Sequence, residues 1–535
     1  MLRKARDEWG GAEGGPAAGG VSGVEGRSVA GAAAVDQAAA TATAVAGGSG
    51  AAAEQTSATE AAAKRTPGAR RTASAGLLVA VGTGVGNVFA YGFNLVLSRG
   101  LGPGGYAELG TLLSVFLIGT VPGMAVQAVN ARRLAVAAGA SAGVRAELLS
   151  ALRRRGLLVG VAVAVVFAVV APAVARLLPS VTMGGVAWTG VSLAANTVFA
   201  SYLGIAQGTS RFVTMTVLYL TAHSTRLAIG AVAAVAAVSP TTVMAAQGVA
   251  WALAGVAGRV LLRGAAAGQV AVQEAAAAQV AVPGAAASEV SARAAAGEAR
   301  PGKAAAREPA ADTTGYLTEV LRATGGLGGI LLFTVLDTLL ASRYLVGGDL
   351  GRYNTGALLA RAAFFAPSFV AMLAFPRLAR PRERRRALVV SLALTGGIGL
   401  LGVVVVGLGG NALIRAAFGA QYAEPGDFDL GVHGWLFMSV GALLALVNLA
   451  LLDGVARRSH TVSAVVLGGI ALETGVVVGF AHGSAAAIVT AAAVSAFVTA
   501  AVAVTVCLTA RAQEPTPAHD LDPYLIPGAP DAAPL

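Results

Sequence analysis

Long apolar blocks recur along this chain and constrain its fold more than any other feature. A helix rises about 1.5 Å per residue, so a block of about 20 apolar residues crosses the roughly 30 Å hydrocarbon core of a bilayer. Hydrophobic residues make up 56% of the 535 residues and charged residues only 12%, about half the charged share of a soluble domain. The sequence therefore predicts an all-α integral membrane protein with many spans.

We place twelve candidate transmembrane helices, six in each half of the chain. In the first half they are 74–98, 106–129, 156–178, 182–208, 212–237 and 241–263. In the second half they are 315–346, 353–375, 387–413, 430–453, 461–481 and 484–510. The first six form a predicted N-lobe, 74–263, and the last six a predicted C-lobe, 313–510.

Three stretches outside these lobes contain few large apolar residues. They are the N-terminus 1–73, the Ala-rich linker 264–312 and the C-terminal tail 511–535. Such segments cannot bury enough apolar surface to offset the entropy of ordering the chain. We expect all three to be disordered, and the N-terminus and linker to be cytoplasmic.

Basic residues alternate between the two sides of the predicted membrane. Clusters such as Arg153 to Arg155 and Arg384 to Arg386 precede odd-numbered spans, while the opposite connections hold scattered arginines. Cytoplasmic loops are enriched in Lys and Arg. This pattern predicts a multi-pass protein of the inner or plasma membrane with both termini in the cytoplasm. It also accounts for the net charge of +11 without a nucleic-acid partner.

One motif occurs twice. "LVLSRGLGPGGY" (95–106) and "LLASRYLVGGDLGRY" (339–353) each place Ser-Arg and a Gly-containing turn before a Tyr that opens the next apolar run. Six spans per half is an even number, so both halves enter the membrane in the same direction. The pattern predicts two parallel six-helix lobes related by an axis along the membrane normal, an architecture suited to rocking around a central cavity.

The fifth span carries an arginine near its middle. Tyr219, His223, Arg226 and Gly230 follow one another at helical spacings, which places them on one face. Ionisable groups at bilayer depth tend to face a cavity or a partner. We predict that Arg226 and His223 bind an anionic substrate; the alternative is an arginine paired with a carboxylate or backbone carbonyls.

Three further residues are candidates for the same role. Arg361 shares a helix face with Asn354 and Ser368. Asn94 lies in the first span, seven residues after Asn87, with Arg99 at the end of that span. We predict that Arg361, Asn94 and Arg99 bind substrate. The alternative for Arg361 and Asn94 is an interhelical hydrogen bond, and the alternative for Arg99 is a side chain that extends to the membrane interface.

Two acids lie within the predicted C-lobe spans. Asp337 is in the seventh span and Glu473 in the eleventh. A carboxyl group in hydrocarbon becomes protonated, pairs with a cation or binds one. We predict that they couple transport to H⁺ or Na⁺; the alternative is a charge pair with Arg226, Arg322 or Arg361. The sequence shows no catalytic, cofactor or metal-site motif, so we expect neither an enzyme nor a bound cofactor.

Three motifs follow one another along the chain. They are an "L-x-R-x-L-G-P-x-x-Y" turn after the first span, the run 333–379 with its Asp and "FPRLA", and "AFGAQYAEP" at 417–425. The turn is formed by Leu97, Arg99, Leu101, Gly102, Pro103 and Tyr106. Through this ordered series, most of residues 74 to 510 resemble the oligosaccharide and polysaccharide flippases of the multidrug/oligosaccharidyl-lipid/polysaccharide (MOP) exporter superfamily. The long linker and the extended N-terminus depart from the family pattern.

The resemblance implies a MATE/MOP-like fold and the flipping of a polyprenyl-pyrophosphate-linked oligosaccharide for cell-surface polysaccharide biosynthesis, by alternating access. The implied partners are the lipid-linked glycan, membrane lipid and polysaccharide-assembly proteins. An anionic pyrophosphate needs cations inside a low-dielectric cavity. Two alternatives stay open: a cation-coupled multidrug antiporter of the same superfamily, which favours acids in the first lobe, and a non-transporting scaffold of a polysaccharide assembly complex.

Overall fold

The computed structural model describes residues 67–280, 313–367, 381–423, 428–457 and 459–510, together with 370, 374 and 378. Helices dominate these ranges, and no β-strand occurs within them. Long runs of Ala, Val and Leu satisfy their backbone groups within each helix, which is the requirement for a chain in hydrocarbon.

The described residues of the first half form one bundle. Its helices are α3 (Pro67–Gly119), α4 (Val121–Val136), α5 (Ala142–Leu177), α6 (Met183–Gly208), α7 (Phe212–Val235) and α8 (Pro240–Val280). α3 contains the first predicted span and most of the second, because it bends at Gly102, which has a φ of 66°. Only Gly adopts that backbone conformation without strain. α4 completes the second span after a break at Thr120, with Pro122 in its first turn.

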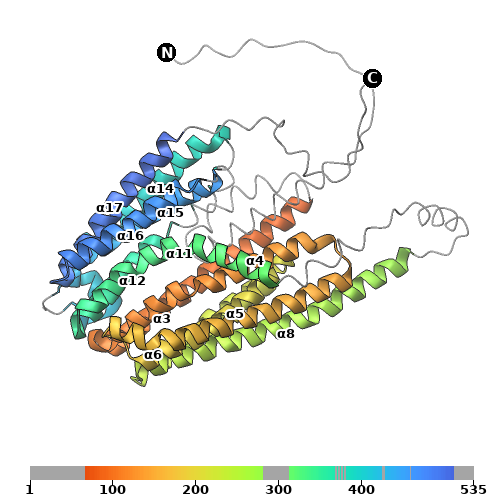
Figure 1. The fold of residues 1–535 in the computed structure, drawn as a ribbon, viewed down its shortest axis with the longest axis horizontal. Coiled ribbons are helices and arrows are strands. Elements are labelled where there is room, and N and C mark those ends of the chain that lie inside the picture. Colours follow the sequence, from red (N-terminus) through yellow and green to blue (C-terminus); the bar gives the residue numbers. More distant parts are fainter. Residues whose placement is uncertain are drawn as a thin grey trace, which may run out of the picture.

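The described residues of the second half form another bundle. Its helices are α11 (Thr313–Tyr344), α12 (Gly347–Phe365), α14 (Pro381–Phe418), the short η2 (Ala420–Tyr422), α15 (Leu430–Ala456), α16 (Thr461–Gly479) and α17 (Ala485–Thr509). Figure 1 shows the two bundles side by side, with α11 and α12 on the side of the second bundle that faces α3. The predicted parallel arrangement of two helical lobes is confirmed.

Within the described part of the chain, nine helical stretches are long and apolar enough to cross a membrane, or ten when the two bent parts of α11 are taken as one span. The count is below twelve in part because α3 and α4 form one continuous stretch, Val81–Gly139. Each of the twelve predicted spans coincides with helix, although the end of 353–375 lies partly outside the described residues. The prediction of an all-α, multi-pass membrane protein is confirmed.

Two helices extend beyond the predicted lobe boundaries. α3 begins at Pro67, before residue 74, and α8 continues to Val280, past residue 263. The α8 extension is rich in Ala, the residue with the highest helix propensity. The remaining stretches predicted to be disordered, 1–66, 281–312 and 511–535, lie outside the described residues.

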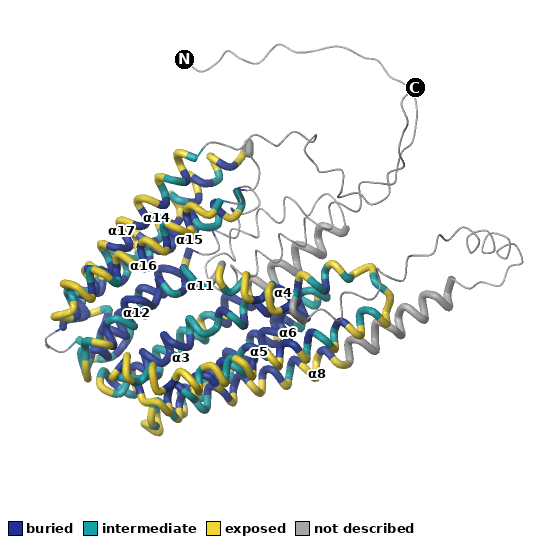
Figure 2. Tube along the Cα trace, in the orientation of Figure 1, coloured by how far each residue is buried: buried dark blue, intermediate teal, exposed yellow. Residues whose placement is uncertain are grey.

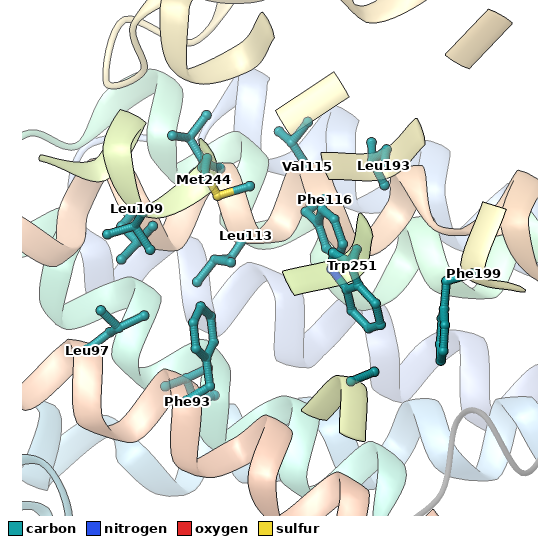
Figure 3. Close-up of a cluster of buried hydrophobic side chains, with 14 of the residues drawn as sticks. Phe93, Leu97, Leu109, Leu113, Val115, Phe116, Leu193, Phe199, Met244 and Trp251 are labelled. Carbon is teal, nitrogen blue, oxygen red and sulfur yellow. The ribbon is translucent and has the colours of Figure 1, made fainter. Parts of the chain in front are cut away.

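Burial is sharply divided between the inner and outer faces of the bundles. Figure 2 shows exposed residues along the outer faces of α5, α8, α14 and α17. Many of these are large and apolar, as expected for contact with lipid; examples are Val169 at 73% exposed, Leu400 at 64% and Phe497 at 62%. The core of the first bundle is built around Phe93, Phe116, Phe199 and Trp251 (Figure 3).

The bundles touch at both ends of the molecule. At one end, which we call the Gly102 end, Tyr422 donates a hydrogen bond to the Ser98 carbonyl at 2.9 Å. There the backbone of Gly351 lies so close to Pro103 that a Cβ atom at Gly351 would overlap the Pro103 carbonyl. At the opposite end, which we call the Glu319 end, the first part of α11 bends by 48° relative to the rest and contacts α4.

Candidate functional site

A cavity of 620 Å³ lies between the two bundles. Its walls come from α3, α4, α6, α7 and α8 of the first bundle and from α12 of the second. Arg226 and Arg361 are both on its wall, and no Asp or Glu is among the described residues that line it. The predicted positively charged chamber between the lobes is therefore present.

Arg226 reaches this cavity from the buried face of α7. Tyr219, His223, Arg226 and Gly230 are all buried, as their spacing predicts. The Arg226 Nη2 donates a hydrogen bond to Gln247 Oε1 at 2.9 Å. Arg226 Nε is buried without a hydrogen-bond partner.

Aromatic rings surround the Arg226 guanidinium. Its central carbon lies 4.5 Å from the ring centroid of Phe93, 5.1 Å from that of Trp251 and 6.0 Å from that of Phe116. The face of an aromatic ring carries negative charge and attracts a cation. Figure 3 shows these three rings converging in the core of the first bundle. The rings stabilise the positive charge without neutralising it, so the guanidinium can still bind an anion.

Arg361 enters the cavity from the second bundle. Its Nη2 donates a hydrogen bond to Ser114 Oγ at 2.5 Å, across the boundary between α12 and α3. Arg361 Nε, like Arg226 Nε, is buried without a hydrogen-bond partner. In the part of the chain that the structure describes, neither arginine has a carboxylate within ion-pair distance. The alternative of a charge pair with Asp337 or Glu473 is therefore not found for either arginine.

The other predicted polar residues lie close to the arginines. His223 lines the cavity, 4.4 Å from Tyr219 and 5.6 Å from Trp251 between ring centroids. Its Nδ1 atom is buried without a hydrogen-bond partner. Asn94 also lines the cavity; its Oδ1 accepts a hydrogen bond from the Tyr106 hydroxyl at 3.3 Å. The structure thus brings four of the five predicted substrate residues to one cavity.

Arg99 is the exception. It lies at the Gly102 end, where its Nη1 donates to the Ala416 carbonyl at 3.3 Å, and it is not among the cavity-lining residues. The side chain joins α3 to α14, in keeping with the simpler interpretation of this residue. An arginine at the end of an apolar run can lie either at the membrane interface or in a cavity. The sequence motif alone therefore could not predict which of the two positions Arg99 takes.

Asp337 and Glu473 form a second polar group, inside the C-lobe. Asp337 is 3% exposed and Glu473 1%. Asp337 accepts hydrogen bonds from the Tyr353 hydroxyl and the Thr338 hydroxyl, both at 3.2 Å. Glu473 Oε1 is buried without a hydrogen-bond partner. The two carboxyl groups interact electrostatically with each other, and Asp337 does so with Arg361.

The two copies of the repeated motif make similar contacts in the two lobes. Tyr106 follows the turn of the first copy and bonds Asn94; Tyr353 follows the turn of the second and bonds Asp337. Both tyrosines are fully buried. The repeat is therefore chemical as well as topological: a tyrosine at the start of the second helix holds a polar side chain on the first helix.

Sequence reasoning missed several residues around the arginines. Gln247 and Trp251 come from α8, and Ser114 from α3, so their proximity depends on how distant helices pack. A signal was present for Gln247, because an amide within an apolar span tends to face a partner. No pattern along the sequence marks Trp251 or Ser114.

No family model and no curated protein matches this sequence. Solved structures do match. One is a multidrug resistance MATE family transporter of the MOP superfamily in an inward-facing conformation, with 11% identity, a TM-score of 0.57, and 79% of this chain and 93% of that chain covered. An outward-facing structure of a multidrug resistance MATE family transporter has 12% identity and a TM-score of 0.49, and the match covers 80% of this chain and 92% of that chain. A MOP superfamily transporter from Pyrococcus furiosus has 12% identity and a TM-score of 0.47, and the match covers 81% of this chain and 94% of that chain.

The first of these likenesses shows that the chain has the fold of MATE transporters of the MOP superfamily. The predicted fold is thereby confirmed.

Proposed function

We propose that this protein flips a polyprenyl-pyrophosphate-linked oligosaccharide across the membrane by alternating access, for the biosynthesis of a cell-surface polysaccharide. One observation carries the proposal. The cavity between the lobes is lined by two buried arginines and, among the described residues, by no acid. Such a cavity favours an anionic group and disfavours the organic cations that a multidrug antiporter would bind.

The two arginines suit a pyrophosphate because they come from opposite lobes. A guanidinium presents several N–H donors in a plane and can bind two phosphate oxygens at once. The free Nε groups of Arg226 and Arg361 are donors that the protein does not satisfy by itself. A bound pyrophosphate would satisfy both and draw the two lobes together. Asn94 and His223 supply further polar atoms at the same cavity.

We propose that Asp337 and Glu473 couple this step to an ion. Neither lines the cavity, but Asp337 interacts electrostatically with Arg361, which does. Binding of H⁺ or Na⁺ at the acid pair would remove negative charge from behind Arg361 and so change its attraction for an anion. We therefore assign ion coupling to this pair and substrate binding to the two arginines.

From the distribution of basic residues we propose that the Glu319 end faces the cytoplasm in an inner or plasma membrane, with both termini on that side. The contacts at the Gly102 end then close the cavity toward the outside. When the contacts at the Glu319 end break, the head group enters from the cytoplasm while the polyprenyl chain stays in lipid. Polysaccharide-assembly proteins are the expected partners on the two sides of this step.

The proposal is tested by deleting the gene in its host and analysing the lipid-linked sugars. We expect the lipid-linked oligosaccharide to accumulate on the cytoplasmic leaflet. Complementation with Arg226→Gln or Arg361→Gln should restore less than a tenth of wild-type flux, because losing a charged hydrogen bond costs about 1.5–3 kcal/mol. Arg259→Gln, which alters an exposed arginine of α8 outside the cavity, is the matched control and should complement fully.

Two results would contradict the proposal. One is an unchanged lipid-linked sugar pool together with altered efflux of cationic dyes, which favours the antiporter. The other is full complementation by both cavity variants at normal protein levels, which favours a scaffold that needs no cavity.

A further inference from the structure

A second cavity, of 690 Å³, lies on the outside of the first bundle. It is formed by α3, α4, α5 and the first part of α11, and we call it the α5–α11 groove. Its wall is mainly aliphatic, with residues such as Val159, Val163 and Val320. It shares no lining residue with the central cavity. Its occupant is therefore separate from the proposed substrate head group.

The depth of the groove matches one leaflet of a bilayer. Arg155 and Phe167 both line it on α5, and a helix rises about 18 Å over the twelve steps from one to the other. One leaflet contributes about 15 Å of hydrocarbon, half of the bilayer core. Arg155 directly precedes the predicted span 156–178, at the depth of the head groups. The groove thus starts at the interface and continues to about the middle of the membrane.

The groove opens to the surroundings of the protein. Leu158 is 52% exposed, Val166 55% and Leu321 69%, and all three are on its wall. In a membrane these side chains face hydrocarbon, so an apolar chain and not water fills the space between them.

One end of the groove is positively charged. Arg155 is 5% exposed, and its guanidinium lies 5.3 Å from the centroid of the Tyr316 ring; the Arg133 guanidinium lies 5.2 Å from the same centroid. Glu319 pairs with Arg133 at 3.0 Å and with Arg132 at 2.9 Å. Arg132 and Arg133 thus share one carboxylate, and Arg155 adds a third guanidinium on the other contact of the Tyr316 ring, so that basic side chains outnumber Glu319 at this end of the apolar groove. Basic residues at this depth attract anionic lipid head groups.

We propose that the α5–α11 groove binds an acyl chain of an anionic phospholipid, with the lipid phosphate against Arg155. Charge complementarity selects an anionic head group, and the length of one leaflet selects an acyl chain over the longer chain of a polyprenyl carrier. The bound lipid contacts α5 of the first bundle and α11 of the second, so it strengthens the contact between the lobes at the Glu319 end. The inference does not depend on what the central cavity carries.

The test uses the full-length chain in mild detergent and native mass spectrometry, with phosphatidylglycerol or phosphatidylcholine of identical acyl chains. The wild type should retain one phosphatidylglycerol at least about tenfold better than phosphatidylcholine, the ratio that one charged hydrogen bond supplies. Arg155→Gln should remove this preference. Arg154→Gln alters the adjacent arginine, which is exposed and does not line the groove, and should keep it.

A second pair of variants tests the groove itself. Ala162→Trp places an indole inside it, whereas Val165→Trp places the same side chain on the exposed face of α5 outside it. A phosphatidylglycerol with a photoreactive acyl chain should cross-link to α5 and α11 in the wild type and in Val165→Trp, and at least about tenfold less in Ala162→Trp. Size-exclusion elution checks that each variant is folded. If Ala162→Trp does not fold, the lipid preference of Arg155→Gln compared with that of Arg154→Gln tests the proposal instead.

Three outcomes would overturn the proposal. The first is equal retention of the two phospholipids by the wild type. The second is equal cross-linking in the two tryptophan variants. The third is displacement of phosphatidylglycerol by a polyprenyl phosphate at lower concentration, which would assign the groove to the carrier of the substrate.

Discussion

At the scale of single residues, the two arginines of the central cavity are stabilised without a neutralising acid. Aromatic rings and Gln247 surround Arg226, and Ser114 binds Arg361. A charge held in this way keeps its field in the cavity, whereas a salt bridge would cancel it. This difference separates a binding arginine from one that only fixes the packing of helices.

The sequence predicted this part of the site because the 4, 3, 4 spacing around Arg226 describes a helix face. It could not predict the rings, since Phe93 and Trp251 belong to helices far apart in the chain. Nor could it predict which of Arg99 and Arg361 lies in the cavity, because Arg99 follows an apolar run and Arg361 interrupts one. Only the packing of the lobes placed one at a bundle end and the other in the cavity.

Asp337 carries a prediction at this scale. Asp337→Asn keeps the size of the side chain and can still accept the Tyr353 hydrogen bond, but it cannot lose or gain a proton at that site. We expect normal folding and loss of the dependence of translocation on a Na⁺ or H⁺ gradient. Flux of lipid-linked substrate in proteoliposomes, with and without each gradient, measures this.

The matched control is Asp349→Asn. Asp349 is near the start of α12 and forms a partly exposed pair with Arg352 at 3.5 Å. Its loss should leave the ion dependence intact. Retained ion dependence in Asp337→Asn would assign the acid pair to helix packing alone.

At the scale of helices, a buried ion cluster joins α14, α15 and α17. Arg384 donates two hydrogen bonds of 2.8 Å to the Asp453 carboxylate and a third of 2.8 Å to the Cys507 carbonyl. Arg457 donates to the same carboxylate at 3.0 Å. The last carbonyls of a helix lack partners within the helix and carry partial negative charge, so Arg384 also caps α17.

Removing the acid from this cluster should destabilise the second bundle. Asp453→Ala leaves Arg384 and Arg457 without their carboxylate, and breaking a buried pair costs about 3–5 kcal/mol. The melting temperature in detergent should fall by several degrees, against little change in Asp349→Asn, whose partly exposed pair contributes about 1 kcal/mol or less. A fall of equal size in both variants would argue against a special role for the cluster.

Helix prediction succeeded because long apolar runs leave few alternatives in a membrane. The breaks were harder to predict. α3 continues through the predicted turn by using the positive φ of Gly102, and the second span is interrupted at Thr120. Hydropathy has no sensitivity to a single backbone angle, so the sequence indicated a turn after the first span without locating the bend at Gly102 or the break at Thr120.

At the scale of the whole molecule, the two ends close in different ways. The Gly102 end is held by close backbone packing at Gly351 and by the hydrogen bond from Tyr422. The Glu319 end is held by side chains: the pairs of Glu319 with two arginines and the 3.1 Å hydrogen bond from Tyr316 to Asn130. The Glu319 pairs are partly exposed and therefore break at low cost, which leaves the buried Tyr316–Asn130 hydrogen bond, so we expect the Glu319 end to be the easier one to open.

Glu319→Gln should therefore shift the lobes apart at this end. Spin labels at Ala138 and Arg386, exposed residues of the first and second bundles, report the separation by pulsed electron resonance in a Cys507→Ser background. We expect a longer mean distance in Glu319→Gln than in the parent. An identical distance distribution would show that the Glu319 pairs do not hold the lobes together.

The tyrosine contact that occurs in both lobes has a consequence for their division of labour. In the first lobe the tyrosine holds an amide, whose charge is fixed at zero, and in the second it holds a carboxyl group, which can exchange its proton or bind a metal ion. The tyrosine contact thus holds a group of fixed charge in one lobe and an ionisable group in the other. Of these two contacts, only the one at Asp337 can change its charge when a proton or a cation is exchanged.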